Sequence, residues 1–283
     1  MTEKFAIFIT THGRADNQIT LNTFKALGYT GDWFLVLDNT DSQRDAYVSN
    51  YGIEHIVVFD KQYFIDRTDS CQSVSQPKAV VFARNAVELV AATLGYQYYM
   101  IVDDDITNLR LRYPENGSLK SARLTNHIDQ ILDCVVQYLA SAEIACATFG
   151  FTNTYRGGVA AVEKFTSRNR LCAELFIRNG AIPVDWRANF VEDLVTSIDV
   201  GIRGDVCLQF TPIQLELCMN EGTLPGGMSD AYNETGRFKF YSMPMIIYPN
   251  CVSVEFDGTK WKTRTRAEYS VPKIISSRYR KER

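Results

Sequence analysis

The pattern that most constrains the fold is an alternation of short apolar runs with amphipathic stretches through the first third of the chain. Apolar runs typical of buried strands occupy 5–10, 33–39, 55–60 and 98–102. Before the last run, the segment 76–95 has a helical pattern with these apolar residues on one face: Val80, Ala83, Val87, Val90, Ala91 and Leu94. Strands that alternate with helices pair in parallel, because each parallel neighbour requires a crossover connection. The sequence therefore predicts an α/β fold with a mostly parallel sheet flanked by helices.

Polar residues follow three of these predicted strands. His12 comes after the first strand, Asp38 ends the second, and the triplet from Asp103 to Asp105 follows the fourth. Ligands of parallel sheets bind beyond the carboxyl ends of the strands. These side chains are therefore expected at one site.

The consecutive residues Asp103, Asp104 and Asp105 carry charges that repel one another, and a cation would relieve that repulsion. If extended backbone continues through the triplet, Asp103 and Asp105 face the same side. Their hard oxygen atoms suit Mg²⁺ or Mn²⁺, with phosphate oxygens and water completing the shell. The alternative is an acidic turn that caps a following helix.

Two further helices are predicted in the second half of the chain. The first spans 125–142 and has an apolar face made of Ile128, Leu132, Val135 and Leu139. The second spans 190–204, where Gly204 can terminate a helix. A pair of acids, Glu192 and Asp193, lies near the beginning of this second helix.

These motifs and their order resemble those of GT-A-fold, nucleotide-sugar-dependent glycosyltransferases. The likeness covers about residues 5–205 and is carried by ITTHGR at 9–14, VLDN at 36–39 and FARNAVELVAATLGYQYYMIVDDD at 82–105. Its most specific part is the helix with Ala-Arg-Asn directly before the Asp-x-Asp strand. The resemblance implies a GT-A-like domain at 1–257, with a nucleotide-sugar half at about 1–110 and an acceptor half at about 111–257. A basic tail follows at 258–283.

The resemblance also implies roles for individual residues. It assigns Asp38 to the nucleoside, Arg84 to the donor pocket near the nucleotide, and Asp105 to the metal as its firmest ligand. Asp103 would lie near the ribose or the metal, and the side chain of Asp104 would point away. The implied donor set is Thr11, His12, Arg14, Asp38, Arg84, Asp103 and Asp104, with Mn²⁺ or Mg²⁺ at Asp103 and Asp105. For Arg84, a surface ion pair with Glu88 one helical turn later is the alternative.

Inverting members of this family have an acidic pair at the start of a comparable helix. By resemblance, Asp193 of the Glu192-Asp193 pair is the catalytic base that removes the acceptor proton, as a positioned carboxylate can do. The helix N-terminus is expected to lower the pKa of Asp193 and keep it ionised, although acids are favoured in any first helical turn. Trp186, seven residues upstream of Asp193, is interpreted as a wall of the acceptor site or as a core residue.

Two parts of the family pattern have no match in this sequence. Many members supply a late His as a further metal ligand, whereas the His residues here are His12, His55 and His127. Another residue, or phosphate and water alone, is therefore expected to complete the metal shell. The stretch LPGGMSDAYNETGRF at 224–238 is either a surface turn region or a loop whose backbone amides meet the diphosphate.

Charge is distributed unevenly along the chain. The net charge is −3, but residues 258–283 carry nine Lys or Arg and two Glu, a local +7. In an extended strand, four basic residues around Trp261 would share one face: Lys260, Lys262, Arg264 and Arg266. This stripe is either a solvated tail or a contact for a nucleic-acid backbone.

The outline of the chain is also similar to bacteriophage and TET/JBP-associated glycosyltransferases, which act on hydroxymethylated pyrimidines in DNA. This likeness implies that DNA is one acceptor to test. Polysaccharide and protein acceptors stay open, and a UDP-sugar is the expected donor.

Composition favours a reduced protein without a membrane segment. Seven Cys residues without a CxxC pair are typical of free thiols in a cytosolic protein. No apolar run reaches the length of about 18 residues that would span a bilayer, and MTEKFAIFITTHGR lacks the pattern of a signal peptide. We therefore expect a cytoplasmic protein that does not bind membranes.

Two other function classes also fit the aspartate triplet. It reads Asp103-x-Asp105-x-Thr107, the pattern of haloacid-dehalogenase-like phosphatases, in which Asp103 would be a nucleophile and Asp105 an acid/base. In that family the motif normally ends the first strand of the core, whereas about three predicted strands precede it here. The second alternative is a non-catalytic module that binds a nucleotide sugar.

Overall fold

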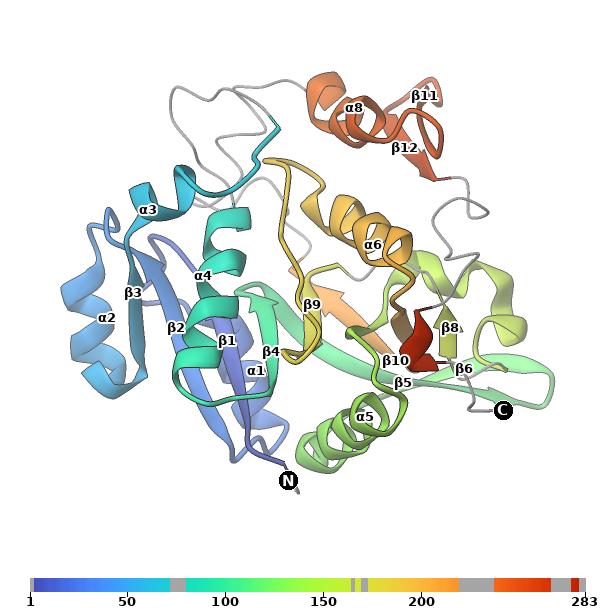
Figure 1. The fold of residues 1–283 in the computed structure, drawn as a ribbon. Coiled ribbons are helices and arrows are strands. Elements are labelled where there is room, and N and C mark those ends of the chain that lie inside the picture. Colours follow the sequence, from blue (N-terminus) through green and yellow to red (C-terminus); the bar gives the residue numbers. More distant parts are fainter. Residues whose placement is uncertain are drawn as a thin grey trace.

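The computed structural model describes residues 3–71, 80–163, 166–168, 173–218, 237–265 and 276–279. Its centre is a ten-stranded sheet in the order β3-β2-β1-β4-β9-β7-β10-β5-β6, with β8 paired to β10. Helices cover both faces of this sheet, and a two-stranded sheet lies apart from it, near the top of Figure 1. The predicted α/β class is confirmed.

The first part of the chain forms the parallel half of the sheet. Its strands are β1 (Phe5–Thr10), β2 (Asp32–Asp38), β3 (Ile56–Phe59) and β4 (Tyr98–Asp103), and its helices are α1 (Ile19–Ala26), α2 (Arg44–Tyr51), α3 (Lys61–Ile65) and α4 (Val80–Thr93). β1 pairs in parallel with β2 and β4, and β2 pairs in parallel with β3. All four predicted strands are confirmed. So is the helix before β4, although its predicted positions 76–79 lie outside the described residues.

The second half of the sheet mixes strand directions. Its strands are β5 (Ile106–Glu115), β6 (Ser118–Arg123), β7 (Cys146–Gly150), β8 (Thr166–Arg168), β9 (Leu175–Asn179) and β10 (Cys207–Leu217). β9 runs antiparallel to both β4 and β7, and β5 runs antiparallel to β10 and β6. Asn116 and Gly117 join β5 to β6 at φ values of 50° and 72°, as the two-residue turn of a hairpin requires. The parallel arrangement predicted from the sequence therefore describes the first half of the sheet.

The predicted helices of the second half are also present, as α5 (Ile128–Ala142) and α6 (Glu192–Ile202). Gly204 follows α6 with φ of 82°, a conformation that glycine adopts without steric cost. Short 3-10 helices occupy Ile53–His55, Thr152–Ala161 and Ser277–Tyr279.

Side chains of the central strands alternate between two cores, one on each face of the sheet. Ile7 of β1 packs with Phe24 of α1 and Leu132 of α5 on one face. Phe8, the next residue along, packs with Val87 of α4 on the other face. Because successive strand residues point to opposite faces, strands buried on both sides produce the continuous apolar runs seen in the sequence.

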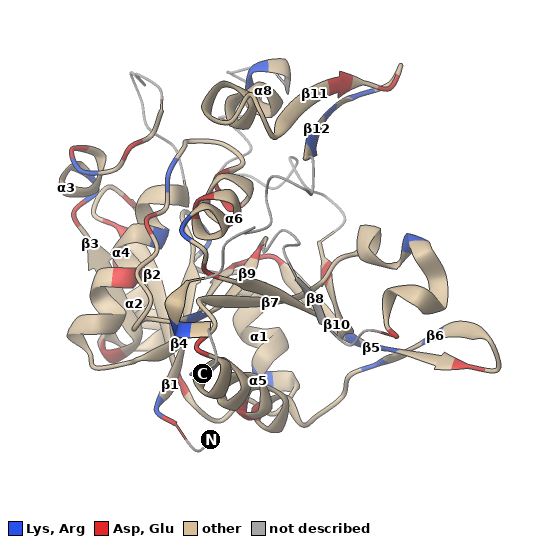
Figure 2. Ribbon diagram, turned by 45° about the vertical axis from the view of Figure 1, so that its right-hand side comes forward, with Lys and Arg blue, Asp and Glu red and all other residues tan. Residues whose placement is uncertain are grey.

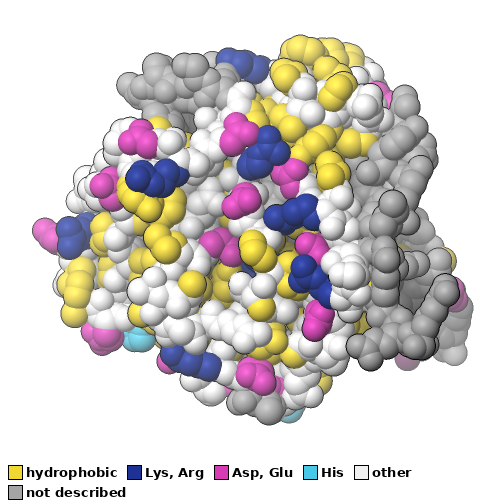
Figure 3. All heavy atoms as spheres, viewed as in Figure 1, with side chains coloured by type: hydrophobic (Ala, Val, Ile, Leu, Met, Phe, Trp, Pro, Cys, Tyr) yellow, Lys and Arg dark blue, Asp and Glu magenta, His cyan; other side chains and the backbone are white. Residues whose placement is uncertain are grey.

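The C-terminal part of the described chain packs against α6. It consists of α8 (Arg237–Ile247) and a hairpin of β11 (Val252–Phe256) and β12 (Trp261–Thr265). Met243 packs against Val195 of α6, and Figure 3 shows hydrophobic side chains gathered at the top of the molecule, where α8 lies. The predicted boundary between residues 257 and 258 falls in the turn of this hairpin.

None of the helices in the described part of the chain is both long and apolar enough to cross a bilayer.

Candidate functional site

The carboxyl ends of β1, β2 and β4 lie side by side and bring the predicted polar residues to one edge of the sheet. Asp38, at the end of β2, accepts a hydrogen bond from Lys61 Nζ at 3.2 Å and lies 3.1 Å from His12 Nδ1. Burial alone would raise the pKa of Asp38, but His12, Thr40 and Lys61 together lower it below its usual range. The hydrogen bond to Asp38 in turn raises the pKa of His12. Asp38 is therefore an ionised acceptor at this edge.

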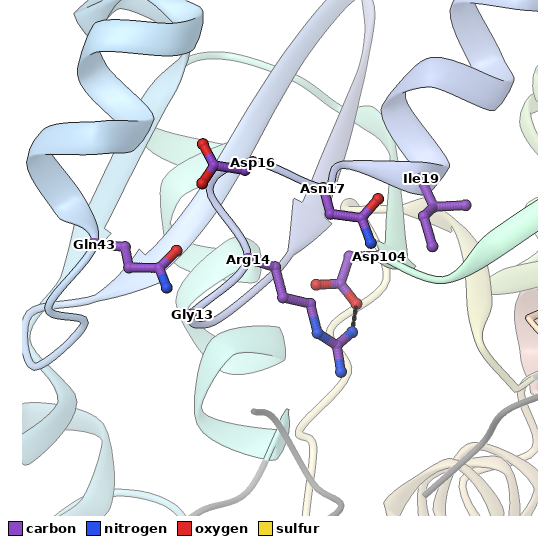
Figure 4. Close-up of a pocket in the computed structure, with 7 residues that line it drawn as sticks. All are labelled: Gly13, Arg14, Asp16, Asn17, Ile19, Gln43 and Asp104. Carbon is purple, nitrogen blue, oxygen red and sulfur yellow. Dashed lines mark hydrogen bonds and ion pairs between the residues drawn. The ribbon is translucent and has the colours of Figure 1, made fainter. Parts of the chain in front are cut away.

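Asp104 contacts the loop after β1. Its carboxylate accepts a hydrogen bond from Thr11 Oγ1 at 2.6 Å and forms an ion pair with Arg14. Arg14 and Asp104 line a hollow of about 180 Å³ together with Gly13, Asp16, Asn17, Ile19 and Gln43 (Figure 4). Burial raises the pKa of Asp104 despite the neighbouring guanidinium of Arg14. Asp104 therefore has other partners than Asp103, whose carboxylate accepts from Thr10 Oγ1 at 3.1 Å and from Arg84 at 3.1 Å.

A third acid joins Asp103 and Asp105. Glu174, just before β9, accepts a hydrogen bond from the backbone N–H of Asp103 through its own carbonyl at 3.0 Å, and its side chain is hydrogen-bonded to the Asp103 carboxylate. Burial, then the charges of Asp103 and Asp105, raise the pKa of Glu174 well above its usual range. Glu174 was not predicted from the sequence, because a lone acid before the apolar run LFI carries no pattern.

The donor atoms at this position suit a hard divalent cation. Asp103, Asp105 and Glu174 supply carboxylate oxygens, and their mutual repulsion is the condition that a cation relieves. Over the residues that the structure describes, no three His, Cys, Asp or Glu form a ready-made metal cage. Phosphate oxygens and water would have to complete a cation's coordination, as Mg²⁺ commonly requires.

Arg84 links the two acidic motifs. Its guanidinium forms an ion pair with Glu192 and donates to Asp103 at 3.1 Å. Only 3% of its side chain is exposed, and its guanidinium lies 4.6 Å from the ring centre of Phe176. Burial opposes the charge of Arg84, but Glu192 and Asp103 raise its pKa above the ordinary value.

The alternative pairing of Arg84 with Glu88 is wrong. Glu88 instead accepts from the buried Arg178 at 2.8 Å. Arg84 faces carboxylates rather than an open pocket, so an influence on a bound donor would pass through Asp103 and Glu192.

Asp193 lies half-buried in the first turn of α6. Burial, reinforced by the charge of Glu192, raises the pKa of Asp193 to about 7. The expectation that the helix N-terminus would lower this pKa is wrong, because desolvation and a like charge outweigh the hydrogen bond from the Leu194 N–H. A carboxylate with this pKa can accept a proton near neutral pH.

Trp186 is a core residue and not a wall of an acceptor site. It is 1% exposed, and its ring packs against Phe176 at a centroid distance of 4.6 Å. Its indole N–H donates to Glu88 at 3.0 Å. A side chain with no exposed face cannot stack against a substrate, so the acceptor-wall interpretation is wrong.

Two residues of the predicted basic stripe are paired within the β11–β12 hairpin. Lys262 forms an ion pair with Asp257, and Arg264 donates to Glu255 at 2.9 Å. Figure 2 shows acidic positions on β11 beside basic positions on β12. Lys260 lies exposed in the turn just before β12. Arg266 and residues 224–236 of the predicted loop at 224–238 lie outside the described residues, and the last two positions of that loop begin α8.

Comparison with known proteins identifies one family. A model of the family described as TET-Associated Glycosyltransferase matches residues 5–220. No curated protein matches the chain significantly.

Solved structures resemble the chain more distantly. Glucosyl-3-phosphoglycerate synthase from Mycobacterium tuberculosis, in complex with Mg²⁺ and UDP, is 10% identical over 93% of this chain and 87% of that one, with a TM-score of 0.47. A second mycobacterial protein is 11% identical over 93% and 84% of the two chains, with a TM-score of 0.48. CMP:2-keto-3-deoxy-manno-octonic acid synthetase, in complex with CTP, is 8% identical over 74% and 90%, with a TM-score of 0.38. All three TM-scores are low, so these structures carry no weight in the assignment.

Proposed function

This chain belongs to the family of TET-associated glycosyltransferases, and we propose that it moves a sugar from a nucleotide sugar to an acceptor hydroxyl with inversion at the anomeric carbon. The donor is a UDP-sugar, and transfer depends on Mn²⁺ or Mg²⁺. Membership of this family makes the chain a glycosyltransferase, so the phosphatase and non-catalytic interpretations of the aspartate triplet are abandoned.

One observation carries this proposal. Asp103 and Glu192 belong to acidic motifs that are far apart in the sequence, yet both contact the guanidinium of Arg84. Arg84 therefore brings the candidate donor site, at the end of β4, next to the candidate base at the start of α6. A transferase needs both in one place, because the acceptor oxygen must reach the sugar that the donor site holds.

Asp103 and Asp105 are the residues that would hold the cation, with Glu174 beside them. When bound there, a divalent cation neutralises charge on the diphosphate leaving group. Asp38 and His12, at the end of the neighbouring strands, would receive the nucleoside.

Asp193 is proposed to act as the base. Its carboxylate takes the proton of the acceptor hydroxyl while that oxygen forms a bond to the anomeric carbon. The bond between the anomeric carbon and the diphosphate oxygen breaks at the same time, and the nucleoside diphosphate leaves with the electron pair. Attack from the face opposite the leaving group inverts the configuration, which NMR of the product reads directly.

A donor panel tests the function as a whole. Nucleoside-diphosphate release should be measured for several nucleotide sugars with Mn²⁺ or Mg²⁺, with and without DNA that contains hydroxymethylated pyrimidines. Release that requires one donor, one metal and an acceptor supports the proposal. Absence of release with every combination, or full release in excess EDTA, contradicts it.

The rate of transfer should depend on pH through Asp193. The base must be ionised, and because its pKa is raised to about 7, kcat/KM should rise with pH and level off above neutrality. A bound cation favours the ionised form, so the midpoint in the metal-loaded enzyme should lie at or below about 7. A pH–rate profile measures this midpoint, and the residual rate of the Asp193→Asn variant should lack the rising limb. A wild-type rate that is flat between pH 5 and 8 would contradict the assignment.

DNA with hydroxymethylated pyrimidines is the proposed acceptor. The β11–β12 hairpin is the proposed contact for its phosphate backbone. Each phosphate that a basic residue neutralises contributes about −0.9 to the slope of log K against log salt. The four residues Lys260, Lys262, Arg264 and Arg266 should contribute about −3.6 to this slope if all of them contact phosphates. The contribution falls to about −1.8 if Lys262 and Arg264 stay paired with their acids. A base must leave a duplex to be modified, so single-stranded DNA should bind at least as well.

A salt series with the four residues changed to Ser measures that contribution. A matched control changes Lys120 and Arg123, two exposed basic residues of β6, to Ser. An equal loss of slope in both variants would place the contact elsewhere. An intact protein without DNA affinity at low salt would exclude the DNA acceptor but not the glycosyltransferase activity.

A further inference from the structure

Asn85 of α4 is bonded to the main chain of Trp186 at two points. Its Nδ2 donates to the Trp186 carbonyl at 2.9 Å, and its Oδ1 accepts from the Trp186 N–H at 3.1 Å. Nδ2 also donates to Thr68 Oγ1 at 3.0 Å. A side-chain amide is the group that matches one backbone donor and one backbone acceptor together, so Asn85 acts like a neighbouring strand for this residue.

The side chain of Trp186 is held by the same helix. Its indole N–H donates to Glu88, which lies three residues after Asn85 and therefore on a neighbouring part of the same helix face. Glu88 is itself held by the buried Arg178. The backbone and the ring of Trp186 are thus both fixed against α4.

The other end of the same segment is also held by α4. Arg84, the residue directly before Asn85, forms the ion pair with Glu192. Two consecutive residues of one helix therefore hold both ends of the segment 186–192, and Asp193 follows immediately.

The backbone between these two anchors is strained. Ala188 and Val191 have φ values of 72° and 53°, in the left-handed region that residues with side chains rarely adopt. Val191 is β-branched, for which this conformation is a genuine outlier. Such conformations persist only where the surrounding structure imposes them. Between the anchors at Trp186 and Glu192, the backbone N–H groups of Ala188 and Asn189 also donate to the carbonyls of Asp69 and Ser70 at 2.9 and 3.1 Å.

We propose that Asn85 is a positioning residue for Asp193: its amide fixes Trp186 so that the strained segment delivers the Asp193 carboxylate to the acceptor hydroxyl. This inference rests on the proposed function of Asp193 as the base. Asn85 does not touch the reacting groups, so its effect on transfer passes entirely through Asp193. The Ala-Arg-Asn motif of α4 then has two roles, an electrostatic one at Arg84 and a backbone one at Asn85.

The test is a double-mutant cycle with Asn85→Ala and Asp193→Asn. A misplacement of about 1 Å can cost as much as about 10²-fold in rate, so Asn85→Ala should lower kcat by up to that factor. Donor affinity, measured by calorimetry with the metal present, should stay at the wild-type value. In the Asp193→Asn background, Asn85→Ala should cause no further loss, because residues that act as a unit are not additive.

Two additional variants separate positioning from general damage. Thr68→Val removes the third partner of the Asn85 amide and keeps the two bonds to Trp186, so its kcat should remain close to wild type. Asn85→Asp keeps an acceptor for the Trp186 N–H but sets a carboxylate oxygen against the Trp186 carbonyl, so its kcat should fall at least as far as that of Asn85→Ala. It also replaces Asn85→Ala in the cycle if the alanine variant does not fold.

The possible outcomes test the positioning role of Asn85 separately from the role of Asp193 as the base. Wild-type turnover in Asp193→Asn alone would overturn the base assignment. If Asp193→Asn lowers kcat as expected, and Asn85→Ala then lowers it by the same factor as in the wild type, only the positioning role is overturned. A fall in donor affinity that accounts for the whole loss in Asn85→Ala would also overturn it.

Discussion

Replacement of Asp193 by Asn should lower the rate of sugar transfer by about 10²- to 10⁴-fold, the usual cost of removing a general base. The amide has nearly the same shape but cannot accept the proton of the acceptor hydroxyl. Donor binding should survive, because the proposed donor residues Asp38, Asp103 and Asp105 remain. Single-turnover transfer and donor calorimetry measure the two quantities separately.

The stability of the same variant provides its control. The raised pKa of Asp193 means that the folded protein pays no penalty below the pKa of the unfolded chain, where the carboxyl is neutral in both states. The penalty grows as pH rises from about 4 to about 7 and is complete above that, so Asp193→Asn should melt higher than wild type at pH 8 and equally at about pH 3. If the variant melts at a much lower temperature than wild type, unfolding explains its lost activity. A variant with wild-type turnover would move the base elsewhere and favour a retaining mechanism.

Replacement of Asp105 by Ala should abolish transfer and metal-dependent donor binding while leaving the fold intact. Asp105 lies in the cluster with Asp103 and Glu174. The charges of Asp103 and Asp105 add to burial in raising the pKa of Glu174. Without metal, removal of one of these charges should raise the melting temperature. With metal, the wild type should be stabilised in proportion to occupancy, and the variant should not respond.

Melting curves across a Mn²⁺ series check this prediction without reference to activity. Glu216→Ala is a matched control, because Glu216 is a partly exposed acid on β10 that contacts Arg110 and Asn108 instead of the cluster. Equal responses of wild type and Asp105→Ala to Mn²⁺ would show that the cation binds elsewhere. Full transfer by wild type in excess EDTA would remove the metal from the mechanism.

Much of the fold could be predicted because the first four strands are buried on both faces. Such strands appear in the sequence as continuous apolar runs, and α4 showed its buried face at helical spacing. The second half, which mixes strand directions, was harder to predict. β9 enters between β4 and β7 far from its sequence neighbours, and no local pattern specifies a partner at that distance.

The candidate site was predictable in its position more than in its contacts. His12 and Asp38 meet, and Asp103 lies at the same edge of the sheet, because parallel strands end at one edge. Glu174 was not predictable, since it reaches the cluster only through the pairing of β9 with β4. The pKa of Asp193 was predicted in the wrong direction, because burial depends on how α6 packs and not on the first turn of the helix alone.

Local order along the chain was enough to specify the first four strands, the helix before the fourth and the acids that follow them, because these depend on hydrophobic periodicity and chain direction. Packing between distant elements decided which charges meet. Arg84 pairs with Glu192, 108 residues away, whereas the neighbouring Glu88 is taken by Arg178. Trp186 has an aromatic ring of the kind that stacks against sugars, but packing between distant elements places it in the core. A buried charge must have a partner at close range, and only the folded chain determines which residue is close enough to be that partner.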